Sequence, residues 1–542
     1  MSAKFGAFDC KVAGGRRAMP VIRPIIDGLL APEAYPHAVV TPIRVAETHI
    51  SWVLLTGEYA YKIKKPLRLS FLDYSTPELR RRCCSEEVRL NSRYAPDLYL
   101  GVATINGSPD SPRIDGTGEV LEHAVRMRQF DPRDELDALV AARTVDASEL
   151  AMLGEHVARF HADAARVDPA STLGSAETVH RVIGDNFAEL QRLPEAGRWT
   201  DSLAALRRWV DETHARLCSR IEQRRDTGHV RECHGDLHCG NVVRWHGSLT
   251  PFDGIEFDAA LRFIDVTNDI AFLTMDLEMH SRIDLRREFL QAWTQSLGDF
   301  GGLPLLPYFE TYRALVRAKV AALRALQERD GSPERSRDCE AAGRYLAWAA
   351  ERTRRTSGGL VLTCGLSGSG KTWIARELAA QLHALHVRSD VERKRIAGLG
   401  ALEDSRSPPD GGIYTREFTA RTYARLEECA ADALAGGESV IVDAAFLKGD
   451  VRRRMLALAR EWSVPAAIVH CVAPRDVLRS RLEKRALSGT DASEAGVSIL
   501  DRQPGFWEDF ADDERRFVVT AHTDSPDATR VALDGLHSLG IP

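Results

Sequence analysis

The sequence contains no apolar run long enough to cross a bilayer, so no membrane-spanning helix is predicted. Its 10 cysteines are scattered without a paired framework, which is typical of a protein in a reducing compartment. An Arg-Arg pair at residues 16–17 precedes a stretch that Arg23, Pro24 and Asp27 interrupt, so it makes a poor export signal. The net charge of −6 argues against general binding to nucleic acids or anionic membranes. These absences favour a cytoplasmic enzyme.

Local patterns divide the 542 residues into regions of different architecture. Residues 1–35 show no periodicity and are expected to form a loosely ordered arm. Thr76 and Pro77 predict the start of a helix, as its N-cap and first residue. Strand-like segments surround this helix, at residues 49–55, 59–64, 99–105 and 122–130. We therefore expect a small lobe of mainly β structure, and a mainly helical region that follows it to about residue 350.

The C-terminal region has apolar strands that alternate with helices. The strand-like runs cover residues 359–364, 438–443 and 466–472. Continuous apolar runs between helical segments are typical of parallel strands that are covered on both faces. The sequence therefore predicts an α/β domain with a parallel sheet and helices on both faces.

Residues 234–241 have the sequence HGDLHCGN, the pattern of a loop that catalyses phosphoryl transfer to a hydroxyl group. In this pattern Asp236 orients the acceptor hydroxyl and takes its proton, and Asn241 binds Mg²⁺. A predicted hairpin follows, and Asp253 comes directly after its second strand, where a second metal ligand is expected. Glu256 is the alternative ligand, and we favour Asp253.

Two further carboxylates, Asp265 and Asp269, follow this motif. We expect them to be structural, as helix caps or as partners that brace the loop.

Residues 365–372 have the sequence GLSGSGKT, which is a P-loop. A predicted buried strand precedes it and a helical pattern follows, which is the context that a P-loop requires. The backbone N–H groups cradle the phosphates in such a loop, while Lys371 reaches the β- and γ-phosphates and the Thr372 hydroxyl binds Mg²⁺. The other loop residues expected to bind nucleotide are Gly365, Ser367, Gly368, Ser369 and Gly370.

The first region resembles the aminoglycoside phosphotransferase-like branch of the protein-kinase-like fold, and within it a bacterial family with a fused P-loop kinase. The resemblance rests on the loop motif and on residues 61–65 (YKIKK) and 252–257 (FDGIEF), and it extends over residues 36–350. A glycine-rich loop over the phosphates is missing, as it is in aminoglycoside-type enzymes.

This resemblance implies a lysine on the third strand that touches the α- and β-phosphates of ATP. Lys62 and Lys64 are both candidates, because residues two apart in a strand share one face. The implied partner is a helix glutamate, Glu86 or Glu87, and we name Glu87 as the site residue. Residues 127–130 are implied to form the hinge against adenine.

Residues 390–393 (DVER) resemble the D-x-x-R element of the polynucleotide kinase, gluconate kinase and zeta-toxin group, and this resemblance extends over residues 358–520. It implies that Asp390 activates the acceptor hydroxyl and that Arg393 steadies the neighbouring acceptor group. Asp443 ends a predicted buried strand, as a Walker-B residue does, and we expect it to hold the Mg²⁺ water shell or the substrate.

Three arginines on a later predicted helix, Arg479, Arg481 and Arg485, are spaced like a lid that closes on the phosphates. We expect one or two of them to act, and name Arg479 and Arg481 as nucleotide-binding residues. Asp491 or Ser493 is expected to cap a further helix.

The two motifs hold a nucleotide in unrelated ways, so we expect two modules in tandem. The expected domains are an arm (1–35), a bilobal α+β kinase-like domain (36–350, with lobes at about 36–135 and 136–350) and an α/β P-loop domain (356–542). The P-loop motif supplies its own phosphate cradle, so this last domain is expected to bind Mg·ATP without residues 1–350.

The expected function is transfer of the γ-phosphate of Mg-ATP by both modules to hydroxyl acceptors, which are small molecules or, for the P-loop domain, a nucleic-acid end. The alternative is a regulatory fusion, in which the kinase-like module only binds a ligand or nucleotide and the P-loop domain alone is catalytic. A chaperone-like ATPase is disfavoured, because no sensor or arginine-finger element is recognisable.

Overall fold

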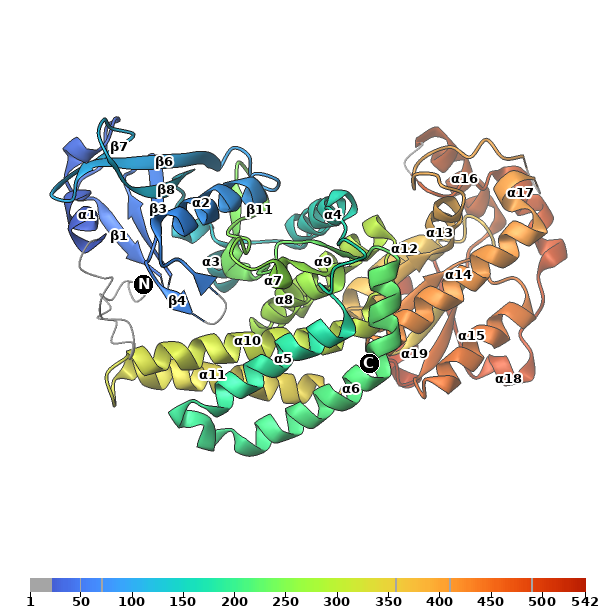
Figure 1. The fold of residues 1–542 in the computed structure, drawn as a ribbon. Helices are drawn as coiled ribbons and strands as arrows, with labels where there is room; N and C mark the ends of the chain where they lie inside the picture. Colours follow the sequence, from blue (N-terminus) through green and yellow to red (C-terminus); the bar gives the residue numbers. More distant parts are fainter. Residues whose placement is uncertain (1–21, 49, 70–71, 356–357, 409–410, 489–490) are drawn as a thin grey trace. The chain divides into compact units, whose positions relative to one another are not determined.

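The computed structural model describes residues 22–48, 50–69, 72–355, 358–408, 411–488 and 491–542. The chain forms two compact units (Figure 1). The first comprises residues 1–282 and 308–353, and the second comprises residues 283–307 and 354–542. Residues 283–307 thus pack with the second unit, although the sequence placed them in the kinase-like domain. The periodic pattern of a helix does not indicate which neighbour the helix packs against. For that reason a single boundary near residue 350 was expected, and it leaves residues 283–307 out of the second unit.

The small lobe of the first unit is an antiparallel sheet with the strand order β1-β2-β3-β8-β6-β7. Two of the expected strands are β2 and β3, which form a hairpin that pairs Ser51 with Lys64. The expected helix α2 begins after Thr76, whose hydroxyl accepts a hydrogen bond from Leu79 N at 3.3 Å. The elements are β1 (Arg44–Glu47), β2 (Ser51–Leu55), β3 (Tyr59–Lys64), β4 (Arg68–Leu69), β5 (Leu72–Asp73), α2 (Pro77–Asn91), β6 (Tyr99–Ser108), β7 (Ser111–Ile114) and β8 (Val120–Arg128).

Helices cover both faces of this sheet. α1 (Ile22–Gly28) packs in a core with Ala124 of β8, whereas α2 packs in another core with the next residue, Val125. Neighbouring strand residues point to opposite faces, so the two helices lie on opposite sides.

Residues 22–35, which the sequence assigned to a loosely ordered arm, form α1 and the 3₁₀ turn η1 (Pro32–Ala34), and α1 is buried in the core. That part of the expectation is wrong, because seven helical residues give too short a periodic signal. Residues 1–21 lie outside the described chain.

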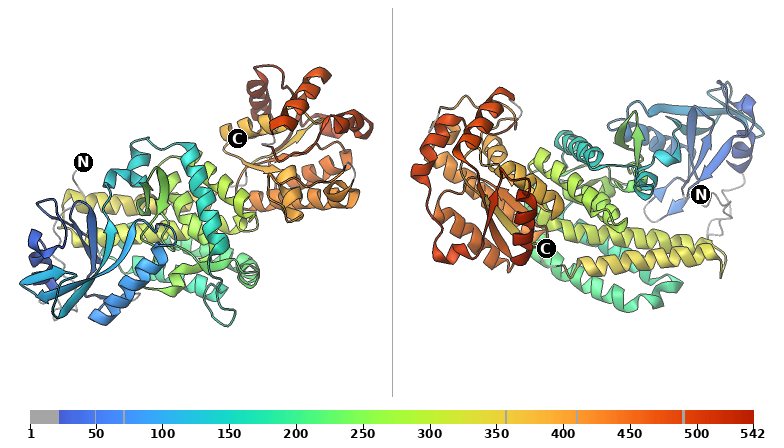
Figure 2. Two further views of the ribbon diagram at one scale, coloured as in Figure 1. Left: turned by 90° about the horizontal axis from the view of Figure 1, so that it is seen from above. Right: turned by 180° about the vertical axis from the view of Figure 1, so that it is seen from behind.

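The large lobe is mainly helical, and it contains two antiparallel strand pairs near the HGDLHCGN loop, β9 with β12 and β10 with β11. Figures 1 and 2 show α10 beside α11 and α5 beside α6. The elements are η2 (Pro132–Asp134), α3 (Leu136–Ala141), α4 (Ala147–Asp163), α5 (Ala176–Gln191), η3 (Pro194–Arg198), α6 (Thr200–Asp226), β9 (Val230–Glu232), η4 (Cys239–Asn241), β10 (Val242–Trp245), β11 (Ser248–Pro251), α7 (Ala259–Arg262), β12 (Phe263–Asp265), α8 (Val266–Met279), α10 (Leu306–Gln327) and α11 (Pro333–Arg352).

The second unit has the predicted parallel sheet, with the order β14-β15-β13-β16-β17 and with helices on both sides (Figure 2). β13 is central and every residue in it is buried, as expected for a strand covered on both faces. The elements are α9 (Ile283–Leu297), η5 (Leu303–Leu305), β13 (Leu360–Cys364), α12 (Lys371–Gln381), β14 (Leu385–Arg388), α13 (Ser389–Ile396), η6 (Gly412–Tyr414), α14 (Arg416–Ala435), β15 (Val440–Asp443), α15 (Gly449–Glu461), β16 (Ala466–Val472), α16 (Arg475–Ser488), α17 (Val497–Arg502), η7 (Gln503–Phe506), α18 (Asp512–Arg515), β17 (Val518–His522) and α19 (Ala528–Ser538). None of the helices in the described ranges combines the length and the apolar character needed to span a membrane.

Helix α9 covers the edge strand β14. The Gln291 side chain accepts a hydrogen bond from His386 N at 2.7 Å and donates one to His386 O at 3.0 Å, as a neighbouring strand would. Arg286 forms a buried ion pair with Glu438 at 2.6 Å. Residues 283–307 are therefore part of the second unit, and the expected domain bounds of 356–542 leave this segment out.

We predict that a fragment of residues 354–542 is unstable alone and that a peptide of residues 283–307 raises its unfolding temperature. The peptide supplies the partner of Glu438, and loss of one partner of a buried ion pair costs about 3–5 kcal/mol. Circular dichroism during heating, at increasing peptide concentration, measures the effect. A peptide with Arg286→Glu is the control and should not stabilise the fragment. Equal stabilisation by both peptides would contradict the role of this contact.

Candidate active sites

The HGDLHCGN loop is held by a buried carboxylate of α8. Asp269 accepts hydrogen bonds from the backbone N–H groups of His234 (3.1 Å) and Gly235 (2.8 Å), and its Oδ2 lies 3.0 Å from His161 Nε2. Burial raises the pKa of Asp269, but these hydrogen bonds and the two histidines outweigh burial, so the pKa lies below its ordinary value. Asp265 caps α8 and pairs with a buried arginine. The expected structural role of both carboxylates is confirmed.

Asp236 is fixed within the loop by Asn241. The Asn241 side chain donates to Asp236 Oδ2 at 2.9 Å and to its backbone oxygen at 3.0 Å, and His238 Nε2 lies 3.6 Å from the carboxylate. Burial raises the pKa of Asp236, but His238, His234 and Arg313 outweigh burial and lower the pKa well below its ordinary value. With one third of its side chain exposed, Asp236 presents an ionised, oriented carboxylate to a ligand.

Two lysines and three carboxylates form a cluster between β3, α2 and the segment after β11. Lys62 Nζ donates to Glu87 Oε1 at 2.8 Å and to Asp253, and Lys64 Nζ donates to Glu87 Oε2 at 2.6 Å and to Glu256. Burial lowers the pKa of each lysine, but the carboxylates outweigh burial and raise it well above its ordinary value. Both lysines are therefore charged, and Glu87 is their shared partner.

The two lysines differ in their access to solvent. The Lys62 side chain is 11% exposed and its partner Asp253 is 40% exposed, whereas Lys64 is 0% and Glu256 is 4% exposed. A ligand can therefore approach the first pair, while the second is closed off. Glu86 pairs instead with Arg89 and Arg262.

Oxygen atoms suited to a metal ion lie in this first site. Asp253 has a φ of 62°, an unusual conformation for a residue with a side chain, and Tyr99 and Asn91 hold its turn by accepting from Asp253 N (3.0 Å) and Gly254 N (2.8 Å). Within the described ranges, the Asn241 amide oxygen and the second carboxylate oxygen of Asp253 have no hydrogen-bond partner. Carboxylate and amide oxygens suit Mg²⁺.

In the second unit, glycines shape the P-loop. Gly365, Gly368 and Gly370 have φ values of 142°, 83° and 82°, which side chains disfavour. A Cβ atom on Gly365 would lie 2.5 Å from a backbone oxygen of β16, so only glycine fits there. Lys371 Nζ donates to Leu366 O at 2.8 Å and therefore lies folded onto the loop.

Two serines of the loop have donors that a phosphate could use. In the part of the chain that the structure covers, the Ser369 hydroxyl is buried without a hydrogen-bond partner. The Ser367 N–H donates to the side-chain oxygen of Gln503 at 2.7 Å. This amide oxygen is uncharged, so a phosphate oxygen could replace it as the acceptor. Gln503 was missed from the sequence, because it reaches the loop from η7, far along the chain.

Asp443 lies beside the loop at the carboxyl end of β15. Thr363 Oγ1 donates to it at 3.1 Å, and His386 Nε2 lies 3.2 Å from its other oxygen. Burial raises the pKa of Asp443, but His386, the Thr372 hydroxyl and Lys371 outweigh burial and lower it well below its ordinary value. An ionised carboxylate next to the P-loop threonine fits the expected Mg²⁺ position.

Asp390 and Arg393 both belong to α13, directly after β14, but their surroundings differ. Among the residues that the structure describes, the half-buried Asp390 carboxylate makes no hydrogen bond or ion pair. Arg393 is buried and donates to Ile413 O at 2.7 Å and to Thr419 Oγ1 at 3.1 Å. The Asp390 carboxylate is therefore available to a substrate at the carboxyl ends of the strands, where the P-loop also begins. The Arg393 guanidinium, in contrast, is held by the protein.

The three arginines of α16 have separate environments. Arg481 donates to Thr523 Oγ1 at 2.9 Å and to Gly368 O at 3.3 Å, so it is anchored to the P-loop backbone. Arg479 is half exposed and lies 3.6 Å from a carboxylate of α17. Arg485 donates to a backbone oxygen at 2.6 Å.

Two acidic residues that precede α17 pair with cations of β14 and α13. Asp491 accepts from Arg388 at 2.9 Å, and Glu494 pairs with Lys394 at 3.0 Å. The helix cap expected at Asp491 or Ser493 is wrong, because α17 begins only at Val497. Sequence spacing gave no signal for these pairs, since their cations belong to β14 and α13.

The chain is similar to known proteins, both over most of its length and in its C-terminal part. The family model described as an AAA domain (AAA_33) matches residues 360–507. An uncharacterized protein of Mycobacterium tuberculosis is 32% identical over 472 residues, which is 86% of this chain and 91% of that protein. An uncharacterized protein of Mycobacterium bovis matches equally well. An adenylyl-sulfate kinase of Myxococcus xanthus is 30% identical over 149 residues, 27% of this chain and 76% of that protein.

Solved structures match shares of this chain at low sequence identity. An amicoumacin kinase in complex with AMP-PNP and Ca²⁺ matches 60% of this chain and 92% of its own, with 15% identity and a TM-score of 0.38. A gluconokinase from Sinorhizobium meliloti matches 34% of this chain and 95% of its own, with 23% identity and a TM-score of 0.26.

We predict that Lys64→Met mainly lowers the stability of the protein, whereas Lys62→Met mainly weakens nucleotide binding. Lys64→Met removes the cation that pairs with the buried Glu256 and should cost about 3–5 kcal/mol of stability. Lys62→Met should destabilise less but should weaken nucleotide binding at the first site. Urea unfolding and calorimetric titration with Mg·AMP-PNP, both in a Lys371→Ala background, separate these effects. If Lys64→Met weakened nucleotide binding more than Lys62→Met does, the phosphate contact would belong to Lys64.

The lowered pKa of Asp269 predicts a pH-dependent stability. A carboxyl group with a depressed folded-state pKa contributes stability above its unfolded pKa, at about pH 4, and loses it as the pH falls through the folded value. The stability difference between the parent and Asp269→Asn should therefore be largest near pH 7 and shrink below about pH 4. Urea unfolding at a series of pH values measures it. A difference that does not change with pH would show that Asp269 is not ionised.

Proposed function

Because the chain belongs to the same family as the uncharacterized proteins of M. tuberculosis and M. bovis, and carries an AAA_33 P-loop domain behind a protein-kinase-like domain, we propose that it is a bifunctional ATP-dependent phosphotransferase. Each unit transfers the γ-phosphate of ATP to its own hydroxyl acceptor. The described cysteines are free thiols, which fits the cytoplasm as its location.

One observation carries the proposal: each unit contains both an accessible carboxylate and the lysine that its motif assigns to the phosphates. In the first unit these are Asp236 and Lys62, and in the second they are Asp390 and Lys371. A hydroxyl acceptor needs the carboxylate, and a nucleoside triphosphate needs the cation.

At the first site, Asp236 accepts a hydrogen bond from the acceptor hydroxyl and holds its oxygen in line with the γ-phosphorus. The new O–P bond forms as the bond from phosphorus to the bridging oxygen breaks, ADP leaves, and the proton passes to Asp236. A low pKa makes Asp236 a weak base, which suits a loose transition state in which orientation matters more than early proton removal. Bound Mg²⁺ neutralises phosphate charge, and the side chains that would hold it are Asn241 and Asp253.

At the second site, the γ-phosphate takes the place of Leu366 O as the partner of Lys371, and the backbone N–H groups of the loop bind the other phosphate oxygens. Thr372 and Asp443 are the residues that would hold Mg²⁺. Asp390 orients the acceptor and receives its proton as the new O–P bond forms, while the bond from the γ-phosphorus to the bridging oxygen breaks and ADP leaves.

Further residues of the second site serve the nucleotide and the acceptor. Arg479 and Arg481 support the phosphates. Arg393 positions the acceptor, which is a small hydroxyl-bearing molecule or a polynucleotide end. The name of the Myxococcus relative, adenylyl-sulfate kinase, is compatible with a small acceptor.

The regulatory fusion is the second candidate, and one contact favours it. Lys62 and Asp253 pair with each other, so the proposed phosphate ligand and metal ligand of the first site are joined without a nucleotide. In this candidate, the first unit binds nucleotide or a small ligand without turnover, and only the P-loop unit transfers phosphate.

The test is ATP consumption by the full chain with pooled hydroxyl-bearing metabolites and oligonucleotides, in the parent and in the variants Asp236→Asn and Asp390→Asn. Loss of a positioned base lowers turnover by ~10²–10⁴-fold. We expect some acceptors to depend on Asp236 alone and others on Asp390 alone. Dependence of all turnover on Asp390 would support the regulatory fusion, and turnover that survives in both variants would refute the proposal.

A further inference from the structure

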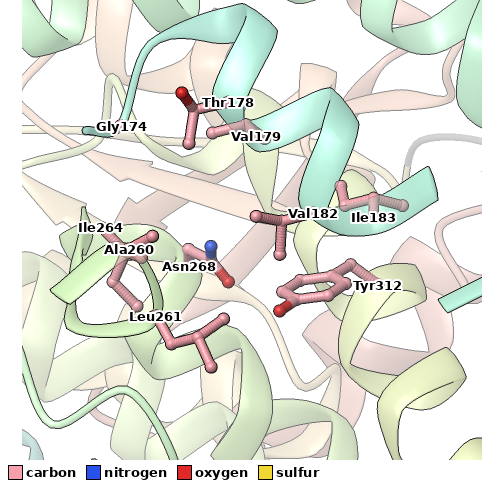
Figure 3. Close-up of a pocket in the computed structure, with 10 residues that line it drawn as sticks. All are labelled: Gly174, Thr178, Val179, Val182, Ile183, Ala260, Leu261, Ile264, Asn268 and Tyr312. Carbon is pink, nitrogen blue, oxygen red and sulfur yellow. The ribbon is translucent and has the colours of Figure 1, made fainter. Parts of the chain in front are cut away.

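The pocket between α5, the segment from α7 to α8 and α10 has room for about one water molecule (Figure 3). Its volume is about 20 Å³. The Asn268 Oδ1 atom, which is buried without a hydrogen bond in the described part of the chain, would accept a hydrogen bond from such a water. The pocket is therefore too small for a substrate, and the second unit holds a stronger candidate for a further functional residue.

That residue is Arg388, the last residue of β14, which lies beside the P-loop carboxylate Asp443. The two residues are paired in the parallel strands β14 and β15, and Arg388 Nε is 4.0 Å from Asp443 Oδ2. This distance is too long for a hydrogen bond. The Thr372 hydroxyl and the charge of Lys371 also act on Asp443. The Arg388 guanidinium therefore lies next to the groups that the P-loop motif assigns to Mg²⁺ and the phosphates.

Most donors of this guanidinium are unused. Nη2 donates to Asp491 Oδ1 at 2.9 Å, which fixes the side chain. Within the ranges that the structure covers, Nε is buried without a hydrogen-bond partner, and Nη1 makes no hydrogen bond either. The side chain is 14% exposed, so a ligand can reach part of it. Because an unpaired charged donor in a buried position is costly, this arrangement indicates a missing anionic partner.

Arg388 also lies close to the proposed acceptor carboxylate along the chain. Asp390 follows two residues later, in the first turn of α13, and its carboxylate makes no hydrogen bond or ion pair among the described residues. The carboxyl ends of parallel strands are where ligands bind in sheets of this kind. A free carboxylate, a guanidinium with unused donors and the Asp443 carboxylate therefore meet at the ends of β14 and β15.

We propose that Arg388 binds the γ-phosphate of ATP at the second site and stabilises the phosphoryl group during transfer. This inference rests on the proposed phosphotransfer by the second unit. The unused N–H groups of Arg388 donate to the γ-phosphate oxygens while the acceptor oxygen bonds to phosphorus, the bond to the bridging oxygen breaks and ADP leaves. The acceptor proton passes to Asp390, and Arg388 stays charged throughout. Negative charge is spread over the phosphoryl oxygens in the transition state, so a fixed guanidinium stabilises it.

The test compares two nucleotides that differ in the γ-phosphate, Mg·AMP-PNP and Mg·ADP. Calorimetric titration uses the full chain with Asp253→Ala, so that only the second site binds. We expect Arg388→Gln to weaken binding of Mg·AMP-PNP by at least about tenfold, because a hydrogen bond between charged groups is lost, and to leave binding of Mg·ADP unchanged. The control is Arg460→Gln, which removes an exposed arginine of α15 and should change neither affinity.

Binding of Mg·ADP in the same samples also shows that the second unit is folded. If Arg388→Gln loses it, Arg388→Lys is the second variant, because lysine keeps the charge opposite Asp491 but not the fork of donors, and it should weaken Mg·AMP-PNP binding selectively. Equal affinities of parent and variant for Mg·AMP-PNP, or equal losses for both nucleotides in both variants, overturn the inference and leave the proposed function standing. A chain with Asp253→Ala that binds no Mg·AMP-PNP overturns the proposed function and the inference with it.

Discussion

Both candidate sites depend on carboxylates that stay ionised although they are buried. Burial alone raises the pKa of a carboxyl group, and a protonated Asp269 or Asp443 could not hold its neighbours as it does. In each case nearby donors outweigh burial: backbone N–H groups and histidines for Asp269, and His386, Thr372 and Lys371 for Asp443. The charge of Asp269 fixes the position of the catalytic loop, and the charge of Asp443 lies next to the P-loop. The geometry of both sites follows from this electrostatic constraint.

The same principle separates the two lysines of β3. Glu87 is fully buried and neutralised by both lysines, so it aligns them in one rigid cluster. Only Lys62 combines this alignment with access to a ligand. Lys64 then acts as the inner support, with Glu256 as its second partner.

Neither unit is a continuous segment of the chain. The chain crosses from one unit to the other three times, after residues 282, 307 and 353. Helix α8, which holds the catalytic loop, is followed in sequence by α9, which covers β14 of the second unit. A single cut therefore cannot release both units intact, and the fusion is more than two domains joined by a linker.

The sequence predicted those features that depend on local spacing. The α2 cap at Thr76, the hairpins, the P-loop between β13 and α12, and the bracing role of Asp269 could all be predicted, because each has a short motif or a strict position along the chain. Features that depend on distant contacts could not be predicted. The unit to which α9 belongs, the pairing of Glu494 with Lys394, and the contact of Gln503 with the P-loop all join segments whose own sequences are ordinary.

The central claim is that one chain has two independent nucleotide sites. Equilibrium dialysis of the full chain with Mg·AMP-PNP at saturation tests it most directly. The account predicts two nucleotides bound per parent chain, and one in each of the single variants Asp253→Ala and Lys371→Ala, because each variant removes a group from one site only. A parent chain that binds a single nucleotide, lost entirely in Lys371→Ala, would contradict the account and leave the P-loop as the one nucleotide site.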